Sequence, residues 1–125
     1  MGDQARANEL ENRLIDFAVR VIKWADASPK TPAGKQMPRP LLRSGTSAAP
    51  HHAEARSPES GKDFVHKGMI ALKELSETSV WRRIVQHANL RKVAWRIALT
   101  DENQQLCRIH NRSVKSANQR PLSND

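Results

Sequence analysis

The chain has 125 residues, and its 21 Lys and Arg against 13 Asp and Glu give a net charge of +8. This length suits one domain and hardly two, and the single cysteine excludes a disulfide framework or a multi-cysteine zinc site. No apolar run approaches the roughly 18–20 residues of a membrane span, and the polar N-terminal residues lack the apolar region of a signal peptide. We therefore expect a small, basic cytoplasmic protein without a membrane partner.

The first helix is expected over residues 9–27. Asn8 is a candidate N-cap, with Glu11 placed as in a capping box. Ser28-Pro29 should end the helix, because the residue before a proline disfavours helical backbone. Apolar residues recur at steps of three and four and so share one face of this helix: Leu10, Leu14, Phe17, Ala18, Val21, Ile22 and Ala25.

A second helix should begin at Thr31 as N-cap, with Pro32 at the first helical position, where proline is tolerated. Three further prolines conflict with this pattern, because a proline inside a helix costs roughly 3 kcal/mol. We therefore expect this helix to be kinked or broken at Pro38, Pro40 or Pro50. Its core-facing stripe would comprise Met37, Leu41, Leu42, Gly45, Ala48 and Ala49.

A third helix should follow the turn at residues 57–61, with Ser60 as candidate cap, and run to about His87. Residues 89–100 are ambiguous between helix and connection. Thr100 should cap a last helix, with Asp101 and Glu102 at the positive end of its dipole. No segment shows the alternation of a strand. The pattern predicts an all-α, antiparallel up-and-down four-helix bundle over residues 8–118, with flexible tails at 1–7 and 119–125.

Positive charge is concentrated in two segments. Residues 27–53 hold four basic and no acidic residues, and residues 78–100 hold five basic and no acidic residues. Lys and Arg can neutralise phosphates, and the indoles of Trp81 or Trp95 could stack on unpaired bases. Solvation of helix faces is the competing explanation. The candidate nucleic-acid-binding residues are Arg39, Arg43, Arg82, Arg83, Arg91, Lys92 and Arg96.

Four blocks of the chain, at residues 8–18, 41–47, 62–67 and 71–81, carry a family resemblance. Together they resemble the small four-helix-bundle proteins encoded by intervening sequences of bacterial 23S rRNA genes (S23-type), and the related accessory protein of diversity-generating retroelements. The resemblance implies a homopentameric bundle with a basic surface for RNA or DNA, no enzymatic activity and no cofactor. For the retroelement branch it implies contact with a reverse transcriptase. The chain departs from the family pattern at the prolines and at Arg82-Arg83.

Other chemistry is weakly supported. Glu74 and Glu77 share a helix face, but a di-iron bundle needs more Glu and His ligands than the chain offers, so we expect no metal and no catalytic residue. The resemblance places this pair near Arg43 and Trp81, which favours a structural contact between helices. Trp81 is expected in the core, and Cys107 in the core or at its boundary. The alternatives are a protein–protein adaptor, for example for a reverse transcriptase; a metalloenzyme bundle; and a degenerate copy without selected function.

Overall fold

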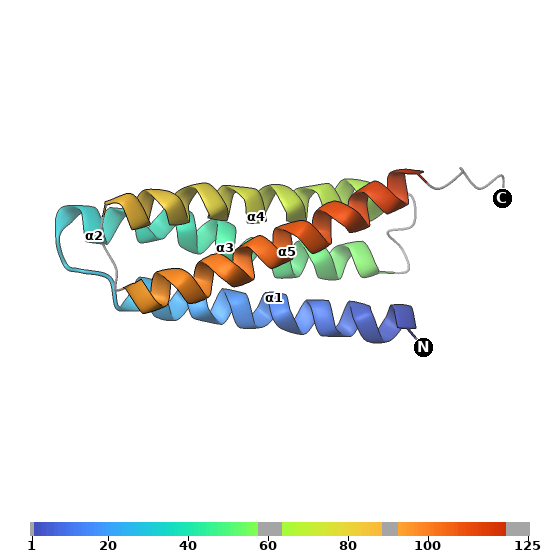
Figure 1. Ribbon diagram of the computed structural model, residues 1–125, viewed down its shortest axis with the longest axis horizontal. Coiled ribbons are helices and arrows are strands. Elements are labelled where there is room, and N and C mark those ends of the chain that lie inside the picture. Colours follow the sequence, from blue (N-terminus) through green and yellow to red (C-terminus); the bar gives the residue numbers. More distant parts are fainter. Residues whose placement is uncertain (1, 58–63, 89–92, 120–125) are drawn as a thin grey trace.

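The computed structural model describes residues 2–57, 64–88 and 93–119. In these ranges the chain forms helices and no strand: α1 (Gly2–Asp26), α2 (Pro32–Gln36), α3 (Pro38–Arg56), α4 (Phe64–His87) and α5 (Val93–Gln119). α2 and α3 together form the second helix of the bundle, with a bend of 23° between the pieces. The predicted antiparallel four-helix bundle with a kinked second helix is confirmed (Figure 1).

The four helices pack around a single core (Figure 1). α3 packs against both α1 and α4, and α5 packs against α4 and more lightly against α1. α1 and α4 make no contact among the described residues, so they occupy opposite corners of the bundle. The outer faces of these two helices therefore point to opposite sides of the molecule.

α1 begins at Gly2, so residues 2–7 continue the helix rather than forming a flexible tail. It ends at Asp26, just before the predicted stop at Ser28-Pro29. Its core face differs from the predicted stripe at two positions, because Trp24 is buried whereas Ile22 is exposed. The spacing of the buried residues is that of a bundle seam: Leu14, Phe17, Val21 and Trp24.

The prolines of the second helix are accommodated by a break at Met37. Thr31 caps α2 as predicted, and its Oγ1 accepts a hydrogen bond of 3.0 Å from the backbone N–H of Gly34. Pro38 and Pro40 fall in the first turn of α3, where backbone N–H groups have no helical partner in any case. Pro50 lies inside α3 on its exposed side.

α1 and α3 approach each other closely at Gly45. A Cβ atom at this position would lie 2.9 Å from Cγ2 of Val21, which is shorter than a normal contact. Ser44, Gly45 and Ala48 supply the small side chains that allow this approach, and all three are buried. Glycine at position 45 is therefore required by packing rather than by backbone conformation.

The beginning of α5 differs from the prediction. The helix begins at Val93, so Thr100 is not a cap and Asp101 and Glu102 lie well inside the helix. Leu99, one residue before the expected cap, is buried in the core. The helix continues through this region because its buried stripe begins before Thr100. The candidate cap Ser60 of the third predicted helix lies outside the described residues.

Candidate nucleic-acid interface

Arg82, expected on a nucleic-acid-binding surface, is buried between α4 and α5 with only 6% of its surface exposed. Its Nη1 donates a hydrogen bond of 2.7 Å to Oγ1 of Thr100, its Nη2 one of 3.3 Å to Oγ of Ser79, and its Nε a longer one of 3.4 Å to Oδ1 of Asn103. These partners are all neutral. Burial lowers the pKa of the Arg82 guanidinium, and the nearby charge of Arg83 lowers it further.

The sequence contains the signal that places Arg82 inside. Thr78, Arg82 and Val85 follow one another at steps of four and three, on the face of α4 that is buried in the core. A count of charges along the chain does not include this helical spacing, so it assigns Arg82 to the surface. The prediction that Arg82 contacts phosphates from the surface is therefore corrected: this arginine is part of the interior of the bundle.

A buried polar layer extends from Arg82 toward α3. Asn103 is fully buried and donates a hydrogen bond of 3.1 Å from Nδ2 to the carbonyl oxygen of Leu75. One turn earlier on the same face of α4, the hydroxyl group of Thr78 donates a hydrogen bond of 2.9 Å to the hydroxyl oxygen of Ser44 on α3. A core that contains polar groups fixes the register of its helices when each group has a partner.

Three of the predicted basic residues, Arg39, Arg43 and Arg83, are exposed. Arg39 and Arg43 lie one turn apart on the outer side of α3. The contact between Ser44 and Thr78 sets the start of α3 beside the end of α4, so all three arginines lie at the same end of the bundle. The remaining predictions, Arg91, Lys92 and the side chains of Trp95 and Arg96, lie outside the described residues.

The predicted structural cluster is arranged differently from the expectation. Trp81 is half-buried and packs against the core. Glu74 and Glu77 are half-buried, and no ion pair joins either of them to Arg43 in the described part of the chain. The side-chain hydrogen bond between α3 and α4 is instead made by the neutral pair Ser44 and Thr78.

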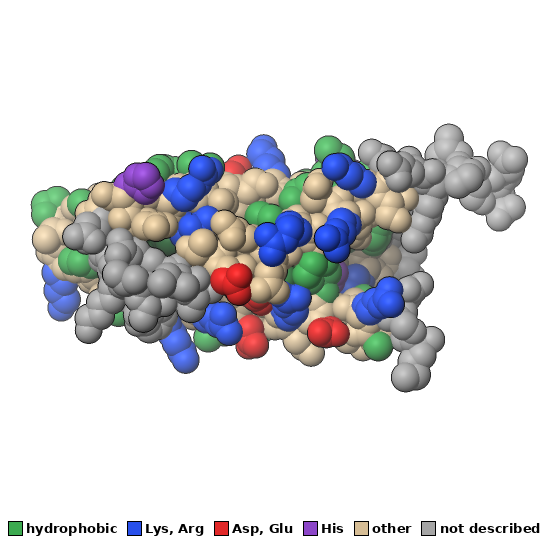
Figure 2. Space-filling model, in the orientation of Figure 1, with side chains coloured by type: hydrophobic (Ala, Val, Ile, Leu, Met, Phe, Trp, Pro, Cys, Tyr) green, Lys and Arg blue, Asp and Glu red, His purple; other side chains and the backbone are tan. Residues whose placement is uncertain are grey.

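A basic row that the charge count did not single out lies on α5. Arg108, Arg112 and Lys115 are all exposed, and their spacing of four and three residues places them on one outer face of the helix. Lys and Arg side chains gather over the C-terminal half of α5 on the side turned to the viewer in Figure 2. The helical spacing of these three residues would have indicated this row. Residues 101–125 hold nearly balanced charge, however, so a count of charges along the chain does not reveal it.

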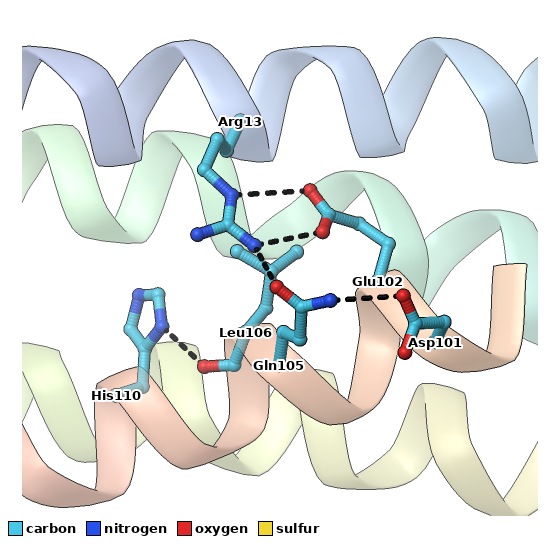
Figure 3. Close-up of polar contacts among 6 residues, drawn as sticks. All are labelled: Arg13, Asp101, Glu102, Gln105, Leu106 and His110. Carbon is cyan, nitrogen blue, oxygen red and sulfur yellow. Dashed lines mark hydrogen bonds and ion pairs between the residues drawn. The ribbon is translucent and has the colours of Figure 1, made fainter. Parts of the chain in front are cut away.

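Arg13 connects α1 to α5 and fixes the register between them (Figure 3). Its Nη2 donates hydrogen bonds of 2.8 Å to Oε1 of Glu102 and of 3.0 Å to Oε1 of Gln105. The hydrogen bond from Arg13 to Glu102 raises the pKa of the guanidinium, although partial burial opposes this. This ion pair also uses one of the few acidic side chains of α5.

Two histidines from different helices, His52 on α3 and His110 on α5, meet toward the other end of the core. His110 is buried, and its Nδ1 donates a hydrogen bond of 2.9 Å to the carbonyl oxygen of Leu106 (Figure 3). Its Nε2 is buried and has no hydrogen-bond partner among the described residues, and its ring lies edge to face with that of His52, with ring centroids 5.7 Å apart. Among the described residues no three His, Cys, Asp or Glu side chains come together as a metal site.

Two outer faces carry exposed apolar side chains. On α1, Ile15, Val19 and Ile22 are between 42% and 47% exposed and share the face opposite the core. On α4, Val80 and Ile84 line a shallow, open hollow together with Arg83 and His87. These faces lie on opposite sides of the molecule, because α1 and α4 occupy opposite corners of the bundle.

Fold and charge together define a small, basic four-helix bundle with a bent second helix. In the described part of the chain, no helix combines the length and the apolar character that a membrane span requires. No protein-family model matches the sequence, and no curated protein is significantly similar to it.

A solved structure does match, with a TM-score of 0.74 and 26% sequence identity over 87% of this chain and 97% of the other. It is the crystal structure of a protein of unknown function from the S23 ribosomal protein family of Bacteroides thetaiotaomicron. The resemblance to S23-type bundles is therefore confirmed.

Proposed function

We propose that this protein is a non-enzymatic, cytoplasmic, RNA-associated bundle that binds phosphates through its basic surface. The observation that carries the proposal is the surplus of unneutralised cations. Ion pairs within the described residues involve only three of the basic side chains, Arg13, Arg56 and Lys67, whereas the chain carries a net charge of +8. A surface of this kind attracts polyanions over long distances.

Two further observations support RNA over other polyanions. The similar crystal structure comes from a family named for a ribosomal protein, although its own function is unknown. The sequence also resembles proteins encoded within 23S rRNA genes, for which a nucleic-acid-binding surface is implied. An adaptor for a reverse transcriptase has no specific contact in its favour and remains the alternative if RNA does not bind.

Fluorescence anisotropy with labelled hairpin fragments of 23S rRNA tests the proposal. We expect binding at low salt that weakens steeply as the salt concentration rises, because each phosphate contact releases a counterion. An acidic bundle of similar size is the control for nonspecific effects. Absence of binding at low salt would refute the RNA-associated role.

We further propose that the protein assembles with copies of itself, as the ring of five that the resemblance implies. The α1 stripe of Ile15, Val19 and Ile22 is followed one turn later by exposed Asp26, while the α4 hollow carries Arg83 and His87. Asp26 and Arg83 therefore place opposite charges at the edges of the two apolar surfaces. A contact between different faces on opposite sides of a molecule joins copies head to tail and closes into a ring when the rotation permits.

Sedimentation analysis of Val19→Glu tests this assembly. A buried carboxylate in an apolar interface is costly, so we expect the variant to be monomeric and still helical. Lys23→Glu, on the flank of the same helix, is the matched control and should leave the assembly intact. A monomeric wild-type protein at micromolar concentration would contradict the proposal.

A further inference from the structure

We infer that the phosphate-binding surface lies on the α1–α5 side of the bundle, at the end where α1 begins and α5 ends, and is formed by Arg6, Arg108, Arg112 and Lys115. This inference rests on the proposed association with RNA and names the surface that performs it. It places the site at the opposite end of the bundle from the exposed arginines Arg39, Arg43 and Arg83 that the sequence predicts.

The register of α1 against α5 brings the four cations together. Arg13 hydrogen-bonds to Gln105, and the two helices run antiparallel. Two turns toward the N-terminus of α1 lead to Arg6, and two turns toward the C-terminus of α5 lead to Arg112, so these residues lie at the same level of the bundle. Both are exposed, and Arg108 and Lys115 flank Arg112 on the same helix face.

The spacing of the row on α5 suits a phosphate backbone. With a rise of about 1.5 Å per residue, Arg108 and Arg112 are separated by about 6 Å along the helix axis and Arg112 and Lys115 by about 4.5 Å. Side chains at these distances can each reach a different phosphate along one strand, because Lys and Arg have long and flexible stems. Such contacts position a nucleic acid without reading its sequence.

Several acidic side chains of α1 and α5 are held in contacts within the described part of the chain. Glu102 pairs with Arg13 at 2.8 Å, Glu11 pairs with Arg56 at 3.2 Å, and Asp101 accepts a hydrogen bond of 2.8 Å from Gln105. Glu9 acts electrostatically on Arg13. None of the four cations of the surface takes part in an ion pair among the described residues. Because these acidic side chains are held in contacts within the fold, the four cations form a basic face, although residues 1–26 and 101–125 each hold nearly balanced charge.

The surface also remains accessible in the proposed assembly. Arg6 follows the helical position of Arg13, which turns toward α5, whereas the α1 stripe of Ile15, Val19 and Ile22 lies on the other side of the helix. Arg83, in contrast, lines the α4 hollow that the assembly would cover. The face on α1 and α5 would therefore be repeated on every copy of a ring, which multiplies weak contacts.

Two triple variants of equal charge loss test the inference: Arg108→Gln/Arg112→Gln/Lys115→Gln, and the matched control Lys35→Gln/Arg39→Gln/Arg43→Gln, which leaves Arg83 of the α4 hollow unchanged. Binding of each full-length variant to the same labelled 23S rRNA hairpin is measured across a salt series. We expect the first variant to lose about tenfold or more in affinity and the slope of log K against log salt to fall by about 2 to 3. The control should change affinity by less than about threefold. Adding Arg6→Gln to the first variant should weaken binding further.

The outcomes separate this inference from the function on which it rests. Equal losses in the two variants, or a larger loss in the control, would overturn the placement while leaving RNA binding intact. Absence of binding by the wild-type protein would overturn both. Circular dichroism shows whether each variant is folded, and because all six substituted side chains are exposed, we expect unchanged helicity.

Discussion

His110 on α5 meets His52 on α3 edge to face, with the ring centroids 5.7 Å apart. His52 in turn places its Nε2 3.5 Å from the carbonyl oxygen of Ala7, so the pair joins α3, α5 and the beginning of α1. Burial lowers the pKa of both imidazoles, and in each case a backbone carbonyl partly offsets this effect. Glu11 raises the pKa of His52, Arg56 lowers it, and His52 lowers that of His110.

The histidine pair predicts that the bundle loses stability in mild acid. A histidine whose folded-state pKa is depressed stabilises the fold fully above its unfolded pKa of about 6.5, and this contribution is lost as the pH falls toward the folded value. We therefore expect the urea midpoint of the wild-type protein to fall between pH 7.5 and pH 5. His110→Leu should flatten this dependence, whereas His66→Gln, at an exposed position of α4, should not. Parallel pH profiles for wild type and His110→Leu would contradict the prediction.

Arg82 should matter for stability rather than for nucleic-acid binding. Truncation in Arg82→Ala leaves a cavity and removes a hydrogen-bond donor from Thr100 and Asn103, so we expect a loss of about 2–4 kcal/mol in the free energy of unfolding. Arg82→Met retains most of the packing of the stem and should cost less. Chemical denaturation measures both changes. If folded Arg82→Met bound RNA tenfold more weakly than wild type, the interior role assigned to this arginine would be wrong.

The close approach of α1 and α3 predicts that alanine is tolerated less well at Gly45 than at Gly68. Alanine normally favours a helix over glycine by about 1 kcal/mol. At Gly45 this gain is opposed by three side-chain atoms of Val21 within 2.9–3.3 Å of the new Cβ, whereas at Gly68 one atom of Val114, at 3.2 Å, is the single close neighbour in the described part of the chain. Because the β-branched side chain of Val21 is stiff, we expect Gly45→Ala to be less stable than Gly68→Ala by about 1–2 kcal/mol. Thermal unfolding of the two variants under the same conditions shows which of them is less stable.

The ion pair of Arg13 and Glu102 should contribute measurably because it is partly buried and has two hydrogen bonds. A double-mutant cycle with Arg13→Met and Glu102→Gln is expected to give a coupling energy of about 1 kcal/mol, near the upper end for pairs of this kind. The coupling should fall at high salt. A coupling energy of zero at low salt would show that the register of α1 and α5 is set by apolar packing alone.

Local patterns predicted the helices better than they predicted the surface. The Thr31 cap and the stop at Ser28-Pro29 depend on neighbouring residues and were predicted correctly. The beginning of α5 was not, because a strong local cap signal at Thr100 competed with a stripe in which the polar Asn103 occupies a core position. In the same way, the positive charge of Arg82 suggested a surface position, whereas the helical spacing of Thr78, Arg82 and Val85 indicates a core position.

The basic face on α1 and α5 depends on tertiary structure and could not be found by counting charges along the chain. Arg13 and Glu102 are 89 residues apart, and only the structure shows that Glu102 forms an ion pair within the fold. The same applies to Arg56 and Glu11. A surface of this kind becomes visible only when the partner of each charge is known.

An even number of antiparallel helices returns the chain to the end at which it started, so α1 begins and α5 ends on the same side (Figure 1). A tag attached near the start of α1 would then lie close to Arg6, and one attached near the end of α5 would lie close to Lys115. A bulky or acidic tag there would shield the basic face and mimic a loss of RNA affinity. A label attached at the opposite end, near the break at Met37, would leave that face clear.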